Sequence, residues 1–169
     1  MIQRQQRSPV RSFLVLCGLG LALLSPAACG SSSDGGGGGG GSISTGTLTG
    51  KIGGTAWTFM SGQTTAALSD ANGWWVELYE VPIDSPCTSS PSASTRSLLL
   101  TLPKTVGAHA LSLQLNETFY IAATSDNLAA TSGTIQLISN DATTIHGAAK
   151  FQFNADNTVD GQFTANICP

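Results

Sequence analysis

The clearest alternation of apolar and polar residues lies in two runs near the C-terminal end of the chain. In the first run every second residue from Ile145 to Phe153 is apolar or small, and in the second the same spacing extends from Val159 to Ile167. Successive side chains of a strand point to opposite faces of a sheet, so this period predicts two strands that each bury one face. The residues between the runs, Asn154-Ala155-Asp156-Asn157, are typical of a turn. The whole segment therefore predicts a β-hairpin.

Shorter runs of the same kind predict further strands within residues 47–169. They lie at residues 48–52, 56–60, 74–81, 97–102, 111–115, 119–123 and 134–139. Residues 97–102 are apolar at almost every position, which is typical of a strand covered on both faces. No window carries the apolar spacing of an amphipathic helix. About nine short strands without a helix predict an all-β domain. We interpret it as an antiparallel β-sandwich, with a small β-barrel as the alternative.

The N-terminal segment has a different pattern. Three arginines, at positions 4, 7 and 11, precede an apolar run from Phe13 to Leu24. A basic segment followed by a short apolar run is typical of a secretory signal peptide. A helix of that run would be roughly 18 Å long, against about 30 Å of bilayer hydrocarbon, which argues against a permanent span. We therefore interpret residues 1–28 as a signal peptide and expect the remaining chain to be exported.

The segment Ala27-Ala28-Cys29-Gly30 resembles the lipobox of bacterial lipoproteins. In that family the cysteine thiol receives a diacylglyceryl group, the chain is cut before the cysteine, and the new amine is acylated, commonly with palmitate. The resemblance implies lipidation of Cys29 and anchoring to the cell envelope. Glycine after the cysteine is similar to lipoproteins sorted to the outer membrane. Pro26 stands where the family usually has leucine, so cleavage after Ala28 and secretion of a soluble protein is the alternative.

Residues 29–46 are rich in glycine and serine and include seven consecutive glycines, Gly35–Gly41. Glycine loses the most backbone entropy on ordering, so we expect a flexible tether between the lipid and the domain at residues 47–169.

Residues 29–169 hold four basic and ten acidic residues, which leaves a net charge of −6. Such a charge repels nucleic acid, so we do not expect a nucleic-acid partner.

Two cysteines remain once Cys17 is removed with the signal and Cys29 is lipidated. Export places the chain in an oxidising compartment, where a single remaining pair is usually a disulfide. The sequence therefore predicts a bridge between Cys87 and Cys168.

Signatures of catalysis or metal binding are missing from the sequence. The two histidines, His109 and His146, lack the spacing of zinc ligands, and no GxSxG motif marks a serine nucleophile. Charged residues make up 10% of the chain, which leaves few acid–base pairs. We expect no catalytic centre, no metal and no cofactor.

Aromatic residues are the remaining candidates for a binding site. If Trp74 faces the core, then Trp75 and Tyr79 lie on the outer face of the same strand. Exposed aromatic side chains there could stack on sugar rings or contact a protein partner.

Short motifs link the chain to a wider group of proteins. The Gly53-Gly54-Thr55-Ala56-Trp57 opening and the closing Gly161-Gln162-Phe163 resemble small uncharacterised bacterial surface lipoproteins, a resemblance that implies no activity. The sequence favours a membrane-anchored, non-catalytic lipoprotein that binds a partner. A carbohydrate- or small-ligand-binding β-module is the alternative.

Overall fold

The computed structural model describes residues 42–112 and 114–169. The predicted signal peptide, Cys29 and residues 29–41 of the predicted tether lie outside the described residues. No helix in the described part is long and apolar enough to cross a membrane.

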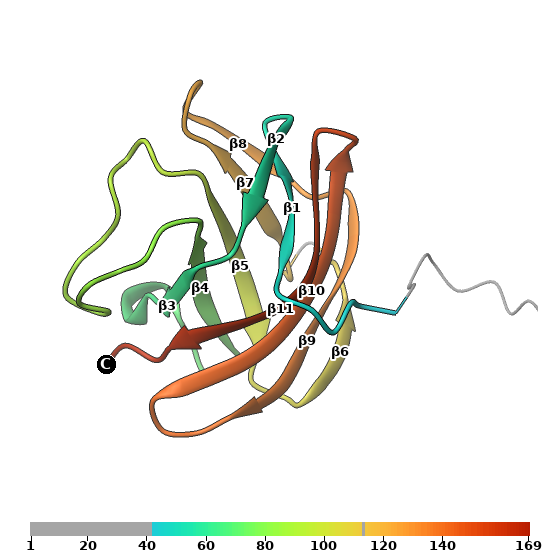
Figure 1. The fold of residues 1–169 in the computed structure, drawn as a ribbon. Helices are drawn as coiled ribbons and strands as arrows, with labels where there is room; N and C mark the ends of the chain where they lie inside the picture. The colour runs from blue at the N-terminus through green and yellow to red at the C-terminus, as the bar shows by residue number, and fades with distance from the viewer. Residues whose placement is uncertain (1–41, 113) are drawn as a thin grey trace, which may run out of the picture. The chain divides into compact units, whose positions relative to one another are not determined.

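Eleven strands and one short 3₁₀ helix, η1 (Ala66–Leu68), make up the described chain (Figure 1). The strands are β1 (Thr49–Ile52), β2 (Thr55–Thr58), β3 (Ser61–Thr64), β4 (Gly73–Tyr79), β5 (Ser97–Pro103), β6 (Gly107–Ala110), β7 (Glu117–Ile121), β8 (Asp126–Ala129), β9 (Ser132–Asn140), β10 (Thr144–Asn154) and β11 (Asn157–Asn166). The predicted all-β class is confirmed.

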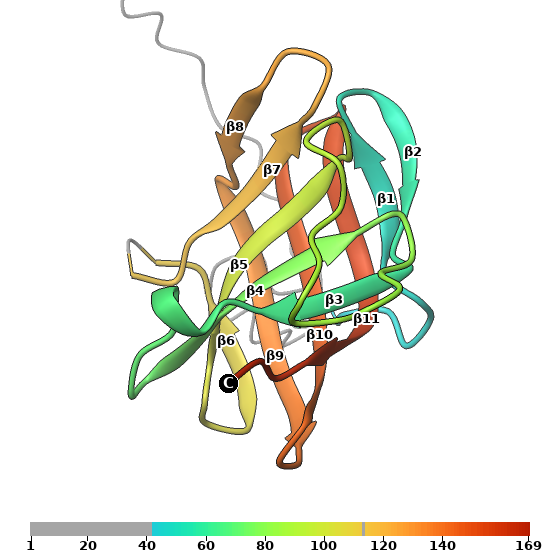
Figure 2. The same cartoon turned by 90° about the vertical axis from the view of Figure 1, so that its left-hand side faces the viewer.

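All strands belong to one sheet, in the order β6-β9-β10-β11-β3-β4-β5-β7-β8, with β1 paired to β11 and β2 paired to β1. The ladders are antiparallel except that β3 joins β11 in parallel through a single pair, Gln63 and Asn166. The sheet curls into a half-barrel, so that β9, β10 and β11 face β4, β5 and β7 across the core (Figures 1 and 2). This curled sheet shares features with both the sandwich and the barrel predicted from the sequence.

Buried side chains from both sides of the curled sheet form the core. β5 contributes Leu98, Leu100 and Leu102, each 0% exposed. On β9 and β10 the large buried side chains are Ile135, Leu137, Ile145 and Phe151. Burying one such side chain contributes about 1.5–3 kcal/mol, so this cluster is the main source of the domain's stability. The opposite face of β5, where Leu99 lies, is only partly covered.

The predicted C-terminal hairpin is confirmed as β10 and β11, which pair from Thr144 and Asn166 to Asn154 and Asn157. The side chain of Asn154 shapes the turn, because its Oδ1 accepts hydrogen bonds from the Asp156 N–H and the Asn157 amide, both at 3.0 Å. Gly161 of β11 has a φ of +144°, and a Cβ there would lie 2.6 Å from the Leu48 Cα. Glycine is therefore required at position 161, where the segment around Leu48 passes close to β11.

The segment before β1 also contacts β11. The Ser44 N–H donates to the Asp160 carboxylate at 2.7 Å, and the Gln162 N–H donates to the Gly46 carbonyl at 2.7 Å. The Lys150 ammonium reaches the Ser42 carbonyl at 3.4 Å. The contacts of the domain therefore begin a few residues before position 47, within the segment that the sequence assigns to the tether.

The strand predicted at residues 111–115 is wrong. The Ser112 hydroxyl accepts hydrogen bonds from the Gln114 N–H at 3.2 Å and the Leu115 N–H at 3.1 Å, which closes a local turn. A serine side chain that bonds its neighbouring backbone competes with strand pairing. Three strands that the sequence did not indicate, β3, β6 and β8, are each four residues long. Each of the three strands has at most one apolar residue larger than alanine, so the sequence shows no alternation of apolar and polar residues there.

Candidate ligand-binding groove

The outer face of β4 carries the side chains that the core does not use. Val76 and Leu78 are 0% exposed and point into the core, so Glu77 and Tyr79 point to the opposite face. Across β4, β5, β7 and β8 the register places four side chains in one row, namely Tyr79, Ser97, Tyr120 and Asn127. This row is the floor of a groove.

Residues 82–96 connect β4 to β5 and run across this outer face (Figure 2). We call this segment the roof loop. The predicted disulfide is confirmed, since Cys87 of the roof loop is bonded to Cys168 with an S–S distance of 2.04 Å. Gln63 of β3 holds the same part of the loop, because its Oε1 accepts from the Cys87 N–H at 2.9 Å. Further along, the Tyr120 hydroxyl donates to the Ala93 carbonyl at 3.1 Å. The roof loop is therefore fixed over the groove at several points.

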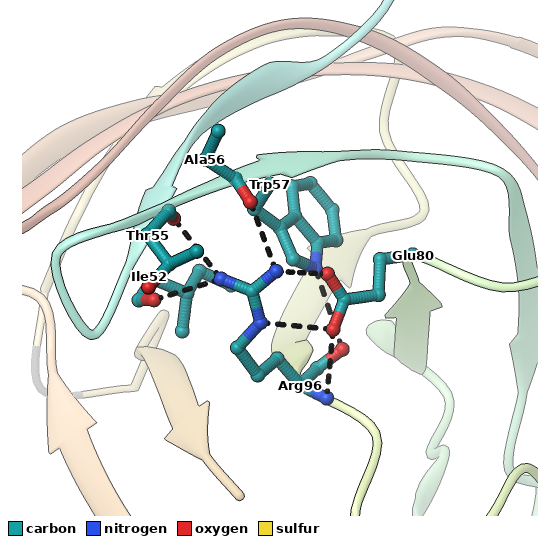
Figure 3. A network of polar contacts seen from close by, with 6 residues as sticks. All are labelled: Ile52, Thr55, Ala56, Trp57, Glu80 and Arg96. Carbon is teal, nitrogen blue, oxygen red and sulfur yellow. Dashed lines mark hydrogen bonds and ion pairs between the residues drawn. The ribbon is translucent and has the colours of Figure 1, made fainter. Parts of the chain in front are cut away.

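Arg96 holds the C-terminal end of the roof loop (Figure 3). Its Nε donates to one oxygen of the Glu80 carboxylate at 2.9 Å, and its Nη2 donates to the other oxygen. The remaining guanidinium N–H groups donate to backbone carbonyls of the β1–β2 hairpin, those of Ile52 and Thr55 at 3.0 Å and that of Ala56 at 2.9 Å. All five guanidinium donors are thus used inside the protein. Arg96 is a structural residue and has no donor left for a ligand.

The groove between the roof loop and the sheet has a volume of about 410 Å³. Its floor is the outer face of β4, β5, β7 and β8, and its wall is residues 90–93 and 95 of the roof loop. The volume lies within the range of about 300–1,000 Å³ that is usual for small-molecule sites. The lining combines two tyrosines, a carboxylate, an amide and several hydroxyl groups. Such a lining offers both flat apolar surfaces and hydrogen-bonding groups to a ligand.

Glu77 and Tyr79 form a hydrogen-bonded pair in the groove. The Tyr79 hydroxyl donates to Oε2 of the Glu77 carboxylate. Burial of the phenol, and then this hydrogen bond, raise the pKa of Tyr79 well above its ordinary value, so the phenol remains protonated. Oε1 of Glu77 has no hydrogen-bond partner among the described residues. No basic residue is in the groove lining. The pair therefore presents one fixed carboxylate oxygen that has no positive partner among the residues that the structure describes.

Of the two residues predicted to contact a ligand, only Tyr79 lines the groove. The expectation that Tyr79 is exposed is wrong, because the roof loop covers it and its exposure is 7%. Trp75 lies on the predicted outer face and is half-buried, but it is outside the groove lining. Its backbone N–H donates to the Ser69 hydroxyl at 3.0 Å.

Glu77 and Asn127 are not among the residues predicted from the sequence, and Tyr120 was not assigned to a ligand contact. The alternation of β4 and β7 places Glu77 and Tyr120 on the outer face, which the pattern alone could have indicated. Asn127 belongs to the short β8, which has no apolar period. The sequence contains no signal for the register that brings β4, β7 and β8 together.

The two histidines lie elsewhere. His109 Nε2 is 3.0 Å from the Thr105 carbonyl, and His146 Nδ1 is 3.3 Å from the Thr164 hydroxyl. Neither residue lines the groove. Within the part of the chain that the structure describes, no group of three or more His, Cys, Asp and Glu residues is placed to hold a metal ion.

A second carboxyl group has an unusual environment. Glu117, the first residue of β7, pairs with Leu100 and points to the core face, where it is 0% exposed. Neither of its carboxyl oxygens has a hydrogen-bond partner among the described residues. Burial raises the pKa of Glu117 well above its ordinary value, because it disfavours the charged form. It lies on the opposite face of β7 from the groove.

Comparisons with known proteins give no match: no family model fits the chain, and no curated protein or solved structure is similar to it.

Proposed function

We propose that this protein is a lipid-anchored protein of the cell envelope whose β domain binds a small polyhydroxylated ligand of the carbohydrate class in the groove under the roof loop. The location rests on the lipobox-like segment around Cys29 alone. The observation that carries the binding function is the groove lining, in which two tyrosines stand next to Glu77, Asn127 and hydroxyl groups. Sugar rings offer flat apolar faces and many hydroxyl groups, so this mixture is complementary to them.

Binding without chemical conversion is the better interpretation of this groove. Hydrolysis of a glycosidic bond usually requires two carboxyl groups that flank the bond. The groove lining contains one carboxylate, Glu77, and neither histidine. Glu77 is held by Tyr79 as a hydrogen-bond acceptor, which suits recognition of a ligand donor.

Binding of a protein partner, the function that the sequence favoured, is the second candidate. A large exposed apolar patch would support it. The exposed large apolar residues of the described chain, Met60, Leu68, Val106 and Ile138, come from four different segments. The groove is therefore the better-supported site.

The test is a glycan array probed with the full chain, purified from membranes in detergent, followed by titration of any glycan that binds. Replacing Tyr120 with alanine removes one aromatic face of the groove, whereas Trp75→Ala removes an aromatic residue from the same sheet face outside the lining. A stacking contact contributes about 1–3 kcal/mol by analogy with stacked bases. We expect Tyr120→Ala to weaken affinity roughly 5- to 150-fold, and Trp75→Ala to leave it unchanged.

The Tyr120→Phe variant separates stacking from loop positioning, because it keeps the ring and removes the hydrogen bond to Ala93. We expect it to retain most of the affinity. Equal losses in Trp75→Ala and Tyr120→Ala would place the ligand outside the groove, and an array without any binding glycan would contradict the carbohydrate assignment.

A further inference from the structure

We infer that the groove selects a ligand that carries a positive charge, as an amino sugar does, and that Glu77 is the residue that recognises the charge. This inference rests on the proposed function and deepens it, because it concerns the same groove. It starts from the carboxylate of Glu77, which lines the groove and has one hydrogen-bond partner, the Tyr79 hydroxyl.

The described residues supply no cation to this carboxylate. The described residues include four basic side chains, and none of them lines the groove. Arg96 uses all its donors on Glu80 and the β1–β2 hairpin, as described above. Lys104 donates to the Asp70 carbonyl at 2.6 Å, and Lys150 forms an ion pair with Asp160 at 3.2 Å. A half-buried carboxylate without a counter-charge is complementary to a cation from outside.

The geometry of the pair fixes where that cation binds. Tyr79 is 7% exposed and donates to Oε2, so it holds the carboxylate in one orientation and leaves Oε1 free. An ammonium group at Oε1 would form a charge-assisted hydrogen bond, which is stronger than a neutral one. The ring of Tyr120, which is less buried than that of Tyr79, can add attraction between its face and the cation. The same ring face would stack on a neutral sugar, so charge is the property that Glu77 adds.

The domain as a whole favours the same sign of ligand charge. Residues 42–169 hold four basic against nine acidic residues. An excess of negative charge raises the local concentration of cations and lowers that of anions. A cationic ligand is therefore attracted at long range by the surface and at short range by Glu77.

The experiment compares the trimer of glucosamine with the corresponding trimer of glucose, in which a neutral hydroxyl group of similar size replaces each ammonium group. Affinity is measured by calorimetry with the full chain in detergent, at a mildly acidic pH at which the amino groups of the glucosamine trimer are protonated. We expect the wild type to bind the glucosamine trimer at least tenfold more tightly, and we expect added salt to weaken this binding.

Two variants test whether Glu77 causes the preference for the charged trimer. Glu77→Gln keeps the shape of the side chain and removes its charge, and Asp156→Asn removes the same charge from the exposed β10–β11 turn, outside the groove. We expect Glu77→Gln to lose roughly tenfold in affinity for the glucosamine trimer, and Asp156→Asn to remain within twofold of the wild type.

The outcomes separate the inference from the proposed function. Equal affinity of the wild type for the two trimers, or equal losses in Glu77→Gln and Asp156→Asn, would overturn the inference and leave a neutral sugar as the ligand. If the wild type binds neither trimer but binds an uncharged glycan on the array, the inference fails alone. If it binds no glycan of any charge, the inference fails together with the proposed function.

Discussion

The buried carboxyl of Glu117 makes the stability of the domain depend on pH in a defined direction. Its ordinary pKa in an unfolded chain is about 4.3. Burial in the core raises the pKa of the folded state well above that value. Between the two values the folded protein holds a proton that the unfolded chain has lost. The free energy of unfolding therefore falls as the pH rises through this window, by about 1.4 kcal/mol per pH unit, and this dependence vanishes below about pH 4.

Replacing Glu117 with leucine tests this dependence directly. Leucine has a similar size and needs no hydrogen bond, whereas the protonated carboxyl leaves two oxygens unpartnered. An unsatisfied buried polar group costs about 1–3 kcal/mol, so the leucine variant should already be more stable than the wild type at pH 4. The difference should then grow by about 1.4 kcal/mol per pH unit until the folded-state pKa is reached. Glu117→Gln should lose the pH dependence while keeping most of the polar cost.

The measurement is denaturant unfolding of the wild type and both variants from pH 4 to pH 8, monitored by tryptophan fluorescence. The Asp156→Asn variant is a control, because this carboxyl lies in an exposed turn. Parallel pH profiles for the wild type and Glu117→Leu would refute the argument, since they would mean that the Glu117 carboxyl titrates alike in the folded and unfolded states. A leucine variant less stable than the wild type at pH 7 would also refute it.

Three further perturbations test other parts of the account. Replacing Cys87 and Cys168 with serine should lower the free energy of unfolding by about 2–4 kcal/mol. Because the roof loop is released, the same change should weaken glycan binding measured by calorimetry, and unchanged binding would show that the loop does not shape the groove. Gly161→Ala should cost about 1–3 kcal/mol in thermal unfolding, because its Cβ would overlap the Leu48 backbone; a neutral result would mean that the crossing chain moves easily. Radiolabelled palmitate should enter the wild type and not Cys29→Ala, and label in the variant would contradict lipidation at that residue.

The parts of the fold that follow local rules could be predicted from the sequence. The β10–β11 hairpin follows from its apolar period and from a turn that Asn154 stabilises. The disulfide follows from the number of cysteines and the expected compartment. The strand proposed at residues 111–115 shows the limit of a period of two, because the hydroxyl of Ser112 closes a turn that the apolar spacing does not reveal.

The groove could be predicted only in part. Alternation along β4 places Tyr79 on the outer face, but it contains no information about what covers that face. The roof loop, held by Gln63 and Tyr120, buries Tyr79 through contacts between residues far apart in the chain. Glu117 shows the same limit for the core, since no local pattern distinguishes a buried carboxyl from an exposed one at the start of a strand.

The most direct test of the central claim is the position of a bound ligand. Amide chemical shifts of the isotopically labelled full chain would be recorded in detergent during titration with a glycan that the array identifies. We predict that the shift changes are concentrated at the groove, around Tyr79, Ser92, Tyr120 and Asn127. Changes concentrated on the outer face of β9, β10 and β11, or around Trp75 alone, would contradict the groove as the binding site.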